Sequence, residues 1–98
     1  AAASYNASKA GMLGLPRALA MEVAPRGVTV NAICPGRIET PMAAGATEEA
    51  NQALLARTPV GFFGKPQDVA DLVSFLASPR SRFITGAAID INGGLAMV

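Results

Sequence analysis

Two short apolar runs, far apart along the chain, set the strongest limit on how this sequence folds. Residues 28–33 read VTVNAI, which is rich in β-branched side chains, and residues 87–91 read AAIDI. Runs of this length with little polar alternation are typical of strands buried on both faces, as in parallel sheets. Cys34-Pro35-Gly36 follows the first run and Asn92-Gly93-Gly94 the second, so each strand is expected to end in a turn.

The segments before and between these runs carry helical patterns. Residues 2 to about 24 place apolar side chains at three- and four-residue spacing, although two glycines and a proline interrupt them. We expect a helix that is kinked near Pro16, lies close against a neighbour through its small residues, and stops at Pro25-Arg26-Gly27. Residues 47–57 predict a short helix capped by Thr47, and residues 69–77 predict a stronger one.

The resulting order is helix, strand, short helix, helix, strand. Two strands joined by a long helical crossover are expected to pair in parallel. A sheet of two parallel strands is too small to be stable alone, because parallel sheets normally have more strands and helices on both faces. The sequence therefore predicts the last third of a doubly wound α/β domain.

Composition excludes several classes of function. The 98 residues are 51% hydrophobic and 15% charged, against about 25% charged in a typical domain. This fits either an alanine-rich small domain or a piece that packs against more protein. A net charge of +1 without a basic stripe predicts no nucleic-acid partner, and no apolar run approaches the ~20 residues of a membrane span. One cysteine and no histidine predict no internal disulfide, no metal site and a reducing, cytoplasmic location.

Tyr5 and Lys9 are the pair with the clearest chemical potential. They are four residues apart, so in a helix they share a face. A nearby ammonium stabilises a phenolate and lowers its pKa, and such a tyrosine can exchange a proton with a carbonyl or alcohol oxygen. The spacing alone is equally met by two solvated residues on one helix face.

Four stretches together carry a resemblance to a known family. YNASKAG, VNAICPGRIETPM, GKPQDVADLVSFLAS and ITGAAIDINGG follow one another in the order and spacing of the short-chain dehydrogenase/reductase family. The resemblance covers nearly the whole chain and is nearest to the branch that includes 3-oxoacyl-(acyl-carrier-protein) reductases. It implies the C-terminal part of a doubly wound, parallel-sheet Rossmann fold, with the N-terminal half missing.

The resemblance also implies roles for single residues. Tyr5 matches the catalytic general acid-base, and Lys9 matches the lysine that binds the nicotinamide ribose and lowers the tyrosine pKa. Both positions therefore contact the cofactor, which is NADP or NAD. The remaining matches lie beside the nicotinamide: Asn31, Pro35 and Gly36 in the strand-end motif, Ile38 through its backbone to the carboxamide, and Thr40 near the carboxamide and diphosphate.

By the same resemblance the chain divides into four segments of one domain. Residues 1–27 form the catalytic helix, 28–36 the strand and Pro-Gly turn, 37–58 the segment that covers the substrate, and 59–98 the last helix and strand. The family's glycine-rich phosphate loop and catalytic serine lie upstream of these residues. We therefore expect a parent enzyme that interconverts a small ketone and a secondary alcohol, and an isolated chain that is inactive.

A non-catalytic role is the alternative. In the family, the first helix here and the last helix-strand unit form subunit interfaces, so the chain could instead act as an oligomerisation or binding module. The expected partners are copies of itself, in a dimer or tetramer, or a full-length relative.

Overall fold

The computed structural model describes residues 2–39 and 47–95. Its elements in chain order are α1 (Ala2–Val23), η1 (Ala24–Arg26), β1 (Ala32–Pro35), α2 (Glu48–Ala56), α3 (Pro66–Leu76), η3 (Pro79–Ser81) and β2 (Ala88–Ile91). The expected order of helices and strands is confirmed. Two single turns of 3-10 helix, η1 and η3, extend the ends of α1 and α3.

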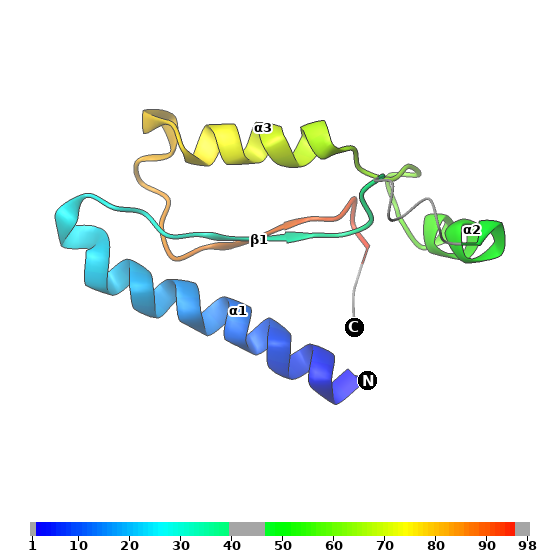
Figure 1. Cartoon of the computed structure of the whole chain (residues 1–98), viewed down its shortest axis with the longest axis horizontal. Coiled ribbons are helices and arrows are strands. Elements are labelled where there is room, and N and C mark those ends of the chain that lie inside the picture. Colours follow the sequence, from blue (N-terminus) through cyan, green and yellow to red (C-terminus); the bar gives the residue numbers. More distant parts are fainter. Residues whose placement is uncertain (1, 40–46, 96–98) are drawn as a thin grey trace.

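The sheet lies between two helices. β1 and β2 pair in parallel, with Ala32 opposite Ala88 and Pro35 opposite Ile91. Figure 1 shows α3 along one face of this pair and α1 along the other, while α2 lies beyond the ends of the strands. The α/β class with parallel strands and helices on both faces, predicted from the sequence, is confirmed.

The first strand is shorter than predicted and lies further along the chain. The ladder begins at Ala32 rather than at residue 28, and it runs through Pro35. Val30 is bound to the turn before β2 instead: its N–H donates to Thr85 Oγ1 at 3.0 Å, and its carbonyl accepts from Gly86 N–H at 2.7 Å. Val30 therefore bonds to the segment before β2, outside the ladder of β1 and β2.

Helix ends follow the capping residues of the sequence. α1 runs without interruption through Pro16 to Val23 (Figure 1), and Gly27 ends the following η1 turn with φ of 76°, which favours glycine. Thr47 caps α2, its Oγ1 accepting from Ala50 N–H at 3.1 Å. α3 begins where Lys65 N–H donates to Asp68 Oδ2 at 2.7 Å.

The described residues enclose little apolar volume. Ala20, Cys34 and Leu95 are buried, whereas many larger apolar side chains are exposed, including Leu15, Met21 and Phe83. The accessible surface is 6954 Å², against about 5,200 Å² for a compact monomer of this mass. The radius of gyration is 15.5 Å, against about 13 Å for a compact domain of this length. The described elements are therefore less compact than a globular domain of this size, and they leave apolar side chains exposed to solvent.

Candidate functional site

The carboxyl ends of β1 and β2 meet at one edge of the sheet. Gly36 N–H donates to Ile91 carbonyl oxygen at 3.0 Å, which extends the ladder into the turns that follow both strands. A Cβ at Gly36 would lie 2.7 Å from Asn92 Cβ and 2.9 Å from Asn92 Cα. The glycine is therefore required by the second turn. The family resemblance had placed Gly36 beside the nicotinamide, and this contact with Asn92 was not predicted.

Residues 37–39 continue from this edge beside Gly64. Gly64 N–H donates to Arg37 carbonyl oxygen at 3.0 Å, and Glu39 N–H donates to Gly64 carbonyl oxygen at 2.8 Å. In a parallel bridge of this kind, the N–H and C=O of the central residue point away from the partner. Ile38 is that central residue, and neither group is hydrogen-bonded within the part of the chain that the structure describes.

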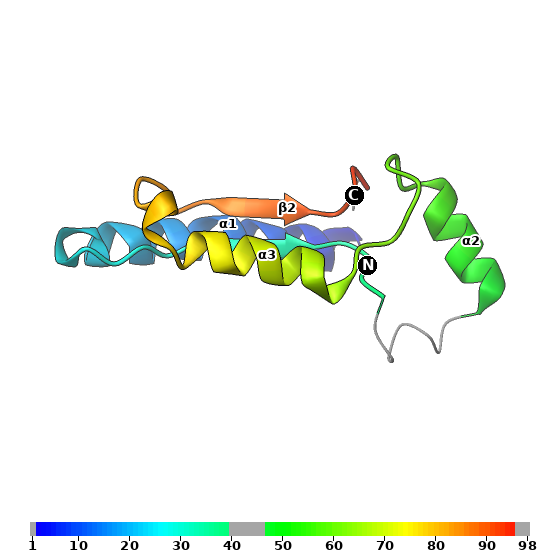
Figure 2. The same ribbon diagram turned by 90° about the horizontal axis from the view of Figure 1, so that it is seen from above.

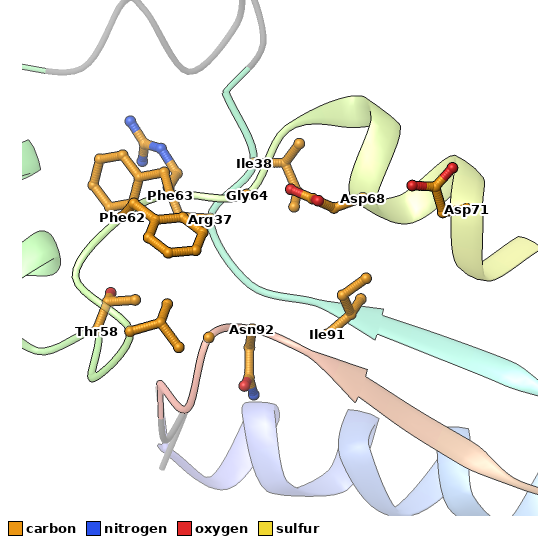
Figure 3. Close-up of a pocket in the computed structure, with 12 residues that line it drawn as sticks. Arg37, Ile38, Thr58, Phe62, Phe63, Gly64, Asp68, Asp71, Ile91 and Asn92 are labelled. Carbon is orange, nitrogen blue, oxygen red and sulfur yellow. The ribbon is translucent and has the colours of Figure 1, made fainter.

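Arg37 connects three segments at this edge. Its Nη2 donates to Asn51 Oδ1 in α2 at 2.7 Å, and its Cζ lies 5.5 Å from the centre of the Phe63 ring. Figure 3 shows the guanidinium beside the two phenylalanine rings of the loop that precedes α3. Sequence reasoning assigned Arg37 no role, because both partners are distant in sequence. The Phe63 ring packs against Arg37.

A cavity of about 340 Å³ lies on the α3 side of this edge (Figure 3). Apolar side chains make up much of its wall, and two carboxylates of α3 stand at its rim. Asp68 is engaged in the helix cap, and Asp71 Oδ1 accepts from Gln67 Nε2 at 2.6 Å. Among the residues whose side chains the structure describes, none of those in α1 lines it.

The predicted acid-base pair lies in α1. Tyr5 and Lys9 are in the first half of this continuous helix, one turn apart. Figures 1 and 2 both show this half directed toward the end of the molecule where β1 and β2 finish. The two positions are therefore on the side of the strands' carboxyl ends, together with Pro35, Gly36 and Ile38. Thr40 lies outside the described residues.

Asn31 lies at the other end of β1. Its Oδ1 accepts from Ala87 N–H at 3.0 Å, and its Nδ2 donates to Ile84 carbonyl oxygen at 3.3 Å. This amide therefore joins β1 to the segment that leads into β2. The family match placed Asn31 with the Pro-Gly turn, whereas its contacts here are at the amino end of the strand.

Among residues 2–39 and 47–95, no group of three or more histidine, cysteine, aspartate or glutamate side chains could hold a metal ion. None of the helices in that part of the chain is long and apolar enough to cross a membrane.

Parallel strands, helices on both faces and a cluster of turns at the strands' carboxyl ends define a doubly wound α/β protein. In this class of fold, ligands generally bind at that edge. The sequence matches the family described as enoyl-(acyl carrier protein) reductase over residues 1–96, and the chain belongs to the short-chain dehydrogenase/reductase family, as its motifs predict.

Individual relatives agree with this assignment. The chain is 47% identical over 96 residues to a 3-oxoacyl-(acyl-carrier-protein) reductase of Rickettsia felis, covering 98% of this chain and 40% of that protein. It is 45% identical over 96 residues to the protein of the same name from Escherichia coli, covering 98% and 39%. The crystal structure of a 3-oxoacyl-(acyl-carrier protein) reductase from Brucella melitensis superposes with a TM-score of 0.88 at 42% identity, covering 96% and 35%.

The chain therefore spans about 40% of the length of the curated relatives it matches. The similarity to the crystal structure confirms the expected C-terminal part of a doubly wound Rossmann fold.

Proposed function

We propose that the native protein is an NAD(P)-dependent oxidoreductase that interconverts a ketone and a secondary alcohol by hydride transfer. Membership of the short-chain dehydrogenase/reductase family supports this activity, and so do the names of the relatives. The observation that carries the proposal is local. Beyond the carboxyl end of β1, the backbone of Ile38 offers one hydrogen-bond donor and one acceptor. The first half of α1 is directed toward this same end of the strands (Figure 1).

The residues at this edge fit a nicotinamide. A carboxamide carries one N–H₂ donor and one carbonyl acceptor, and the N–H and C=O of Ile38 are their complement. Pro35 and Gly36 would line the same surface, and Thr40 is proposed to reach the carboxamide and diphosphate. When bound, the nicotinamide supplies the hydride to the carbonyl carbon.

Tyr5 is proposed as the general acid-base. In the reduction direction its phenol donates a proton to the carbonyl oxygen, and in the oxidation direction its phenolate takes the proton from the alcohol. Lys9, one helical turn away, would favour the phenolate through its positive charge and would bind the ribose hydroxyls. Neither role requires a metal ion or a thiol, and Cys34 is buried inside β1.

Residues 37–58 are proposed to cover the substrate, since α2 lies beyond the carboxyl ends of the strands (Figure 2). The names of the relatives make a 3-oxoacyl thioester the first carbonyl substrate to assay.

The test is replacement of Tyr5 by phenylalanine in the native protein. Removing the hydroxyl is expected to lower kcat for ketone reduction by about 10²- to 10⁴-fold while cofactor affinity, measured by fluorescence titration, changes little. Met21→Leu is the matched control, because Met21 is 80% exposed near the other end of the same helix. An undiminished kcat in Tyr5→Phe would refute the assignment.

We also propose that these 98 residues are inactive by themselves. Hydride transfer requires the cofactor to be held against the carbonyl carbon, and the family's phosphate loop and catalytic serine are not among these residues. Detectable, cofactor-dependent turnover by the purified 98-residue chain, with its mass verified, would contradict this.

The second candidate is a non-catalytic oligomerisation or binding module. The observation in its favour is the apolar surface of α1, where Leu15 is 64% and Met21 80% exposed, because monomers rarely leave such large patches in water. Sedimentation of the 98-residue chain, alone and with a full-length reductase of the same family, tests it. Co-sedimentation supports this role. A chain that remains a stable monomer and does not bind the reductase contradicts it.

A further inference from the structure

The side chain of Arg37 is the structural feature that the proposed chemistry does not use. It leaves the chain directly after the Pro-Gly turn of β1 and is half-buried. One end of its guanidinium hydrogen-bonds Asn51 of α2 at 2.7 Å, while its central carbon lies 5.5 Å from the centre of the Phe63 ring. Its carbonyl oxygen accepts from Gly64 N–H at 3.0 Å. A single residue thus contacts the strand end, the short helix and the loop before α3.

The chemistry of these contacts is specific to arginine. A guanidinium is planar, so it can donate hydrogen bonds in its plane while its face lies over an aromatic ring. The Asn51 bond is short and charge-assisted, which places it among the stronger hydrogen bonds. Lysine could still donate to Asn51 Oδ1, but it has no flat face to lie over Phe63. A positive charge alone therefore does not reproduce both contacts, because the contact with Phe63 requires the planar guanidinium.

The remaining described bonds of α2 are local. Thr47 caps its first turn, Gln52 bonds Glu48 within the helix, and Thr58 Oγ1 donates back to Leu54 carbonyl oxygen at 2.8 Å. No residue of α2 is buried. These bonds stabilise the helix itself but do not fix its position relative to the strands. In the part of the chain that the structure describes, the side-chain hydrogen bond from Arg37 to Asn51 joins α2 to the end of β1.

We propose that Arg37 is a positioning residue that holds α2 against the carboxyl end of β1 and thereby sets the affinity of the proposed site for its carbonyl substrate. This inference rests on the proposed function, because it treats α2 as part of the substrate-covering segment. Arg37 itself takes no part in proton or hydride transfer. Its neighbour Ile38 carries the backbone groups that fit the nicotinamide, so the same short stretch adjoins both the cofactor surface and α2.

The first test measures the position of α2 without reference to activity. Hydrogen exchange, followed by mass spectrometry on the native protein, reports the opening of backbone amides. In Arg37→Met the amides of residues 48–56 are expected to exchange about tenfold faster, since a charge-assisted hydrogen bond and a stacking contact are lost. Arg80→Met is the matched control, because it removes the same charge from an exposed arginine at the other end of the sheet.

Two further variants separate the contact from general damage. Asn51→Leu removes the acceptor alone and is expected to raise exchange in α2 to a similar degree. The double variant Arg37→Met with Asn51→Leu is then expected to be no worse than either single change, as for two partners of one interaction. Arg37→Lys keeps the charge and is expected to restore part of the protection. It also provides the readout if Arg37→Met does not fold.

The second test is kinetic. Arg37→Met is expected to raise KM for the carbonyl substrate about tenfold while kcat and the KM for the cofactor remain within about twofold, as for an interaction equally present in the ground and transition states. Unchanged exchange in α2 overturns the proposal, and so does faster exchange with an unchanged substrate KM. If the native protein reduces no carbonyl compound, the proposed function fails, and the exchange data still decide whether Arg37 positions α2.

Discussion

Replacing Gly36 by alanine tests whether the end of β1 is closed by packing against β2. The added Cβ would lie 2.7 Å from Asn92 Cβ, 2.9 Å from Asn92 Cα and 3.4 Å from Asn92 carbonyl oxygen. Carbon atoms make favourable contacts at about 3.5–4.0 Å, so the two turns would have to separate by roughly 1 Å. Asn92 Cα and Cβ are fixed to the backbone and cannot swing aside as the end of a long side chain can.

The expected cost follows from two opposing effects. Forcing an extra methyl group into a packed contact typically costs about 1–3 kcal/mol. Alanine also restricts the unfolded chain, which returns about 0.4–1 kcal/mol. Gly36 does not have a positive φ, so no backbone strain is added. We therefore expect Gly36→Ala to lower the free energy of unfolding by about 1–2 kcal/mol.

The assay is urea unfolding of the native protein without cofactor. Gly11→Ala in α1 is the comparison, because a Cβ there meets none of the described residues within 4 Å: a gain of about 0.5–1 kcal/mol means that this face of α1 is open, and a loss means that further protein packs on it. If Gly36→Ala unfolds with the free energy of the unaltered protein and loses cofactor affinity instead, the packing argument is wrong. The glycine would then serve the approach of a ligand, as the sequence first suggested.

Four other measurements follow. Lys9→Met removes the positive charge that is proposed to stabilise the Tyr5 phenolate, so the pH profile of alcohol oxidation should move to higher pH; an unmoved profile refutes the role of Lys9. Asn31→Ala leaves Ile84 carbonyl oxygen and Ala87 N–H without their partner and should cost about 1–3 kcal/mol in urea unfolding. Gly93→Ala, at φ of 63° and with Val60 Cγ2 2.6 Å from the new Cβ, should cost at least about 1 kcal/mol in the same assay. The intact mass of the native protein discriminates the two proposed functions: a mass near 9.9 kDa favours the non-catalytic module, and a much larger one favours the reductase.

The element order was predictable because its signals are local. Thr47 followed by acidic residues marks the start of α2, and Gly27 marks the end of η1, whatever the rest of the chain does. The limits of β1 were not predictable in this way. They depend on where β2 begins: Thr85 and Gly86 lie before β2 and are hydrogen-bonded to Val30, and the ladder begins only at Ala32.

In the candidate site, too, local features were predictable from the sequence and contacts between distant residues were not. Tyr5 and Lys9 were identified by a motif within one helical turn, and their roles remain predictions. The contacts of Arg37 join residues that are distant in sequence: Asn51 is 14 residues away, and Phe63 is further still. No periodicity or motif of one sequence reports such a contact. The packing of Gly36 against Asn92 was missed for the same reason.

The surroundings of the glycines show where the described residues pack against one another and where they do not. At the carboxyl edge, Gly36 and Gly93 each stand against a neighbouring residue, so this edge is tightly packed by residues of the chain itself. In α1, a Cβ at Gly11 or Gly14 would meet nothing within 4 Å. The small residues of α1 were expected to let the helix lie close to a neighbour, and none of the described residues is that neighbour. The packed edge is expected if the turns around the proposed nicotinamide surface are formed by contacts within these residues. The exposed face of α1, the helix that carries Tyr5 and Lys9, is expected if further protein covers that helix.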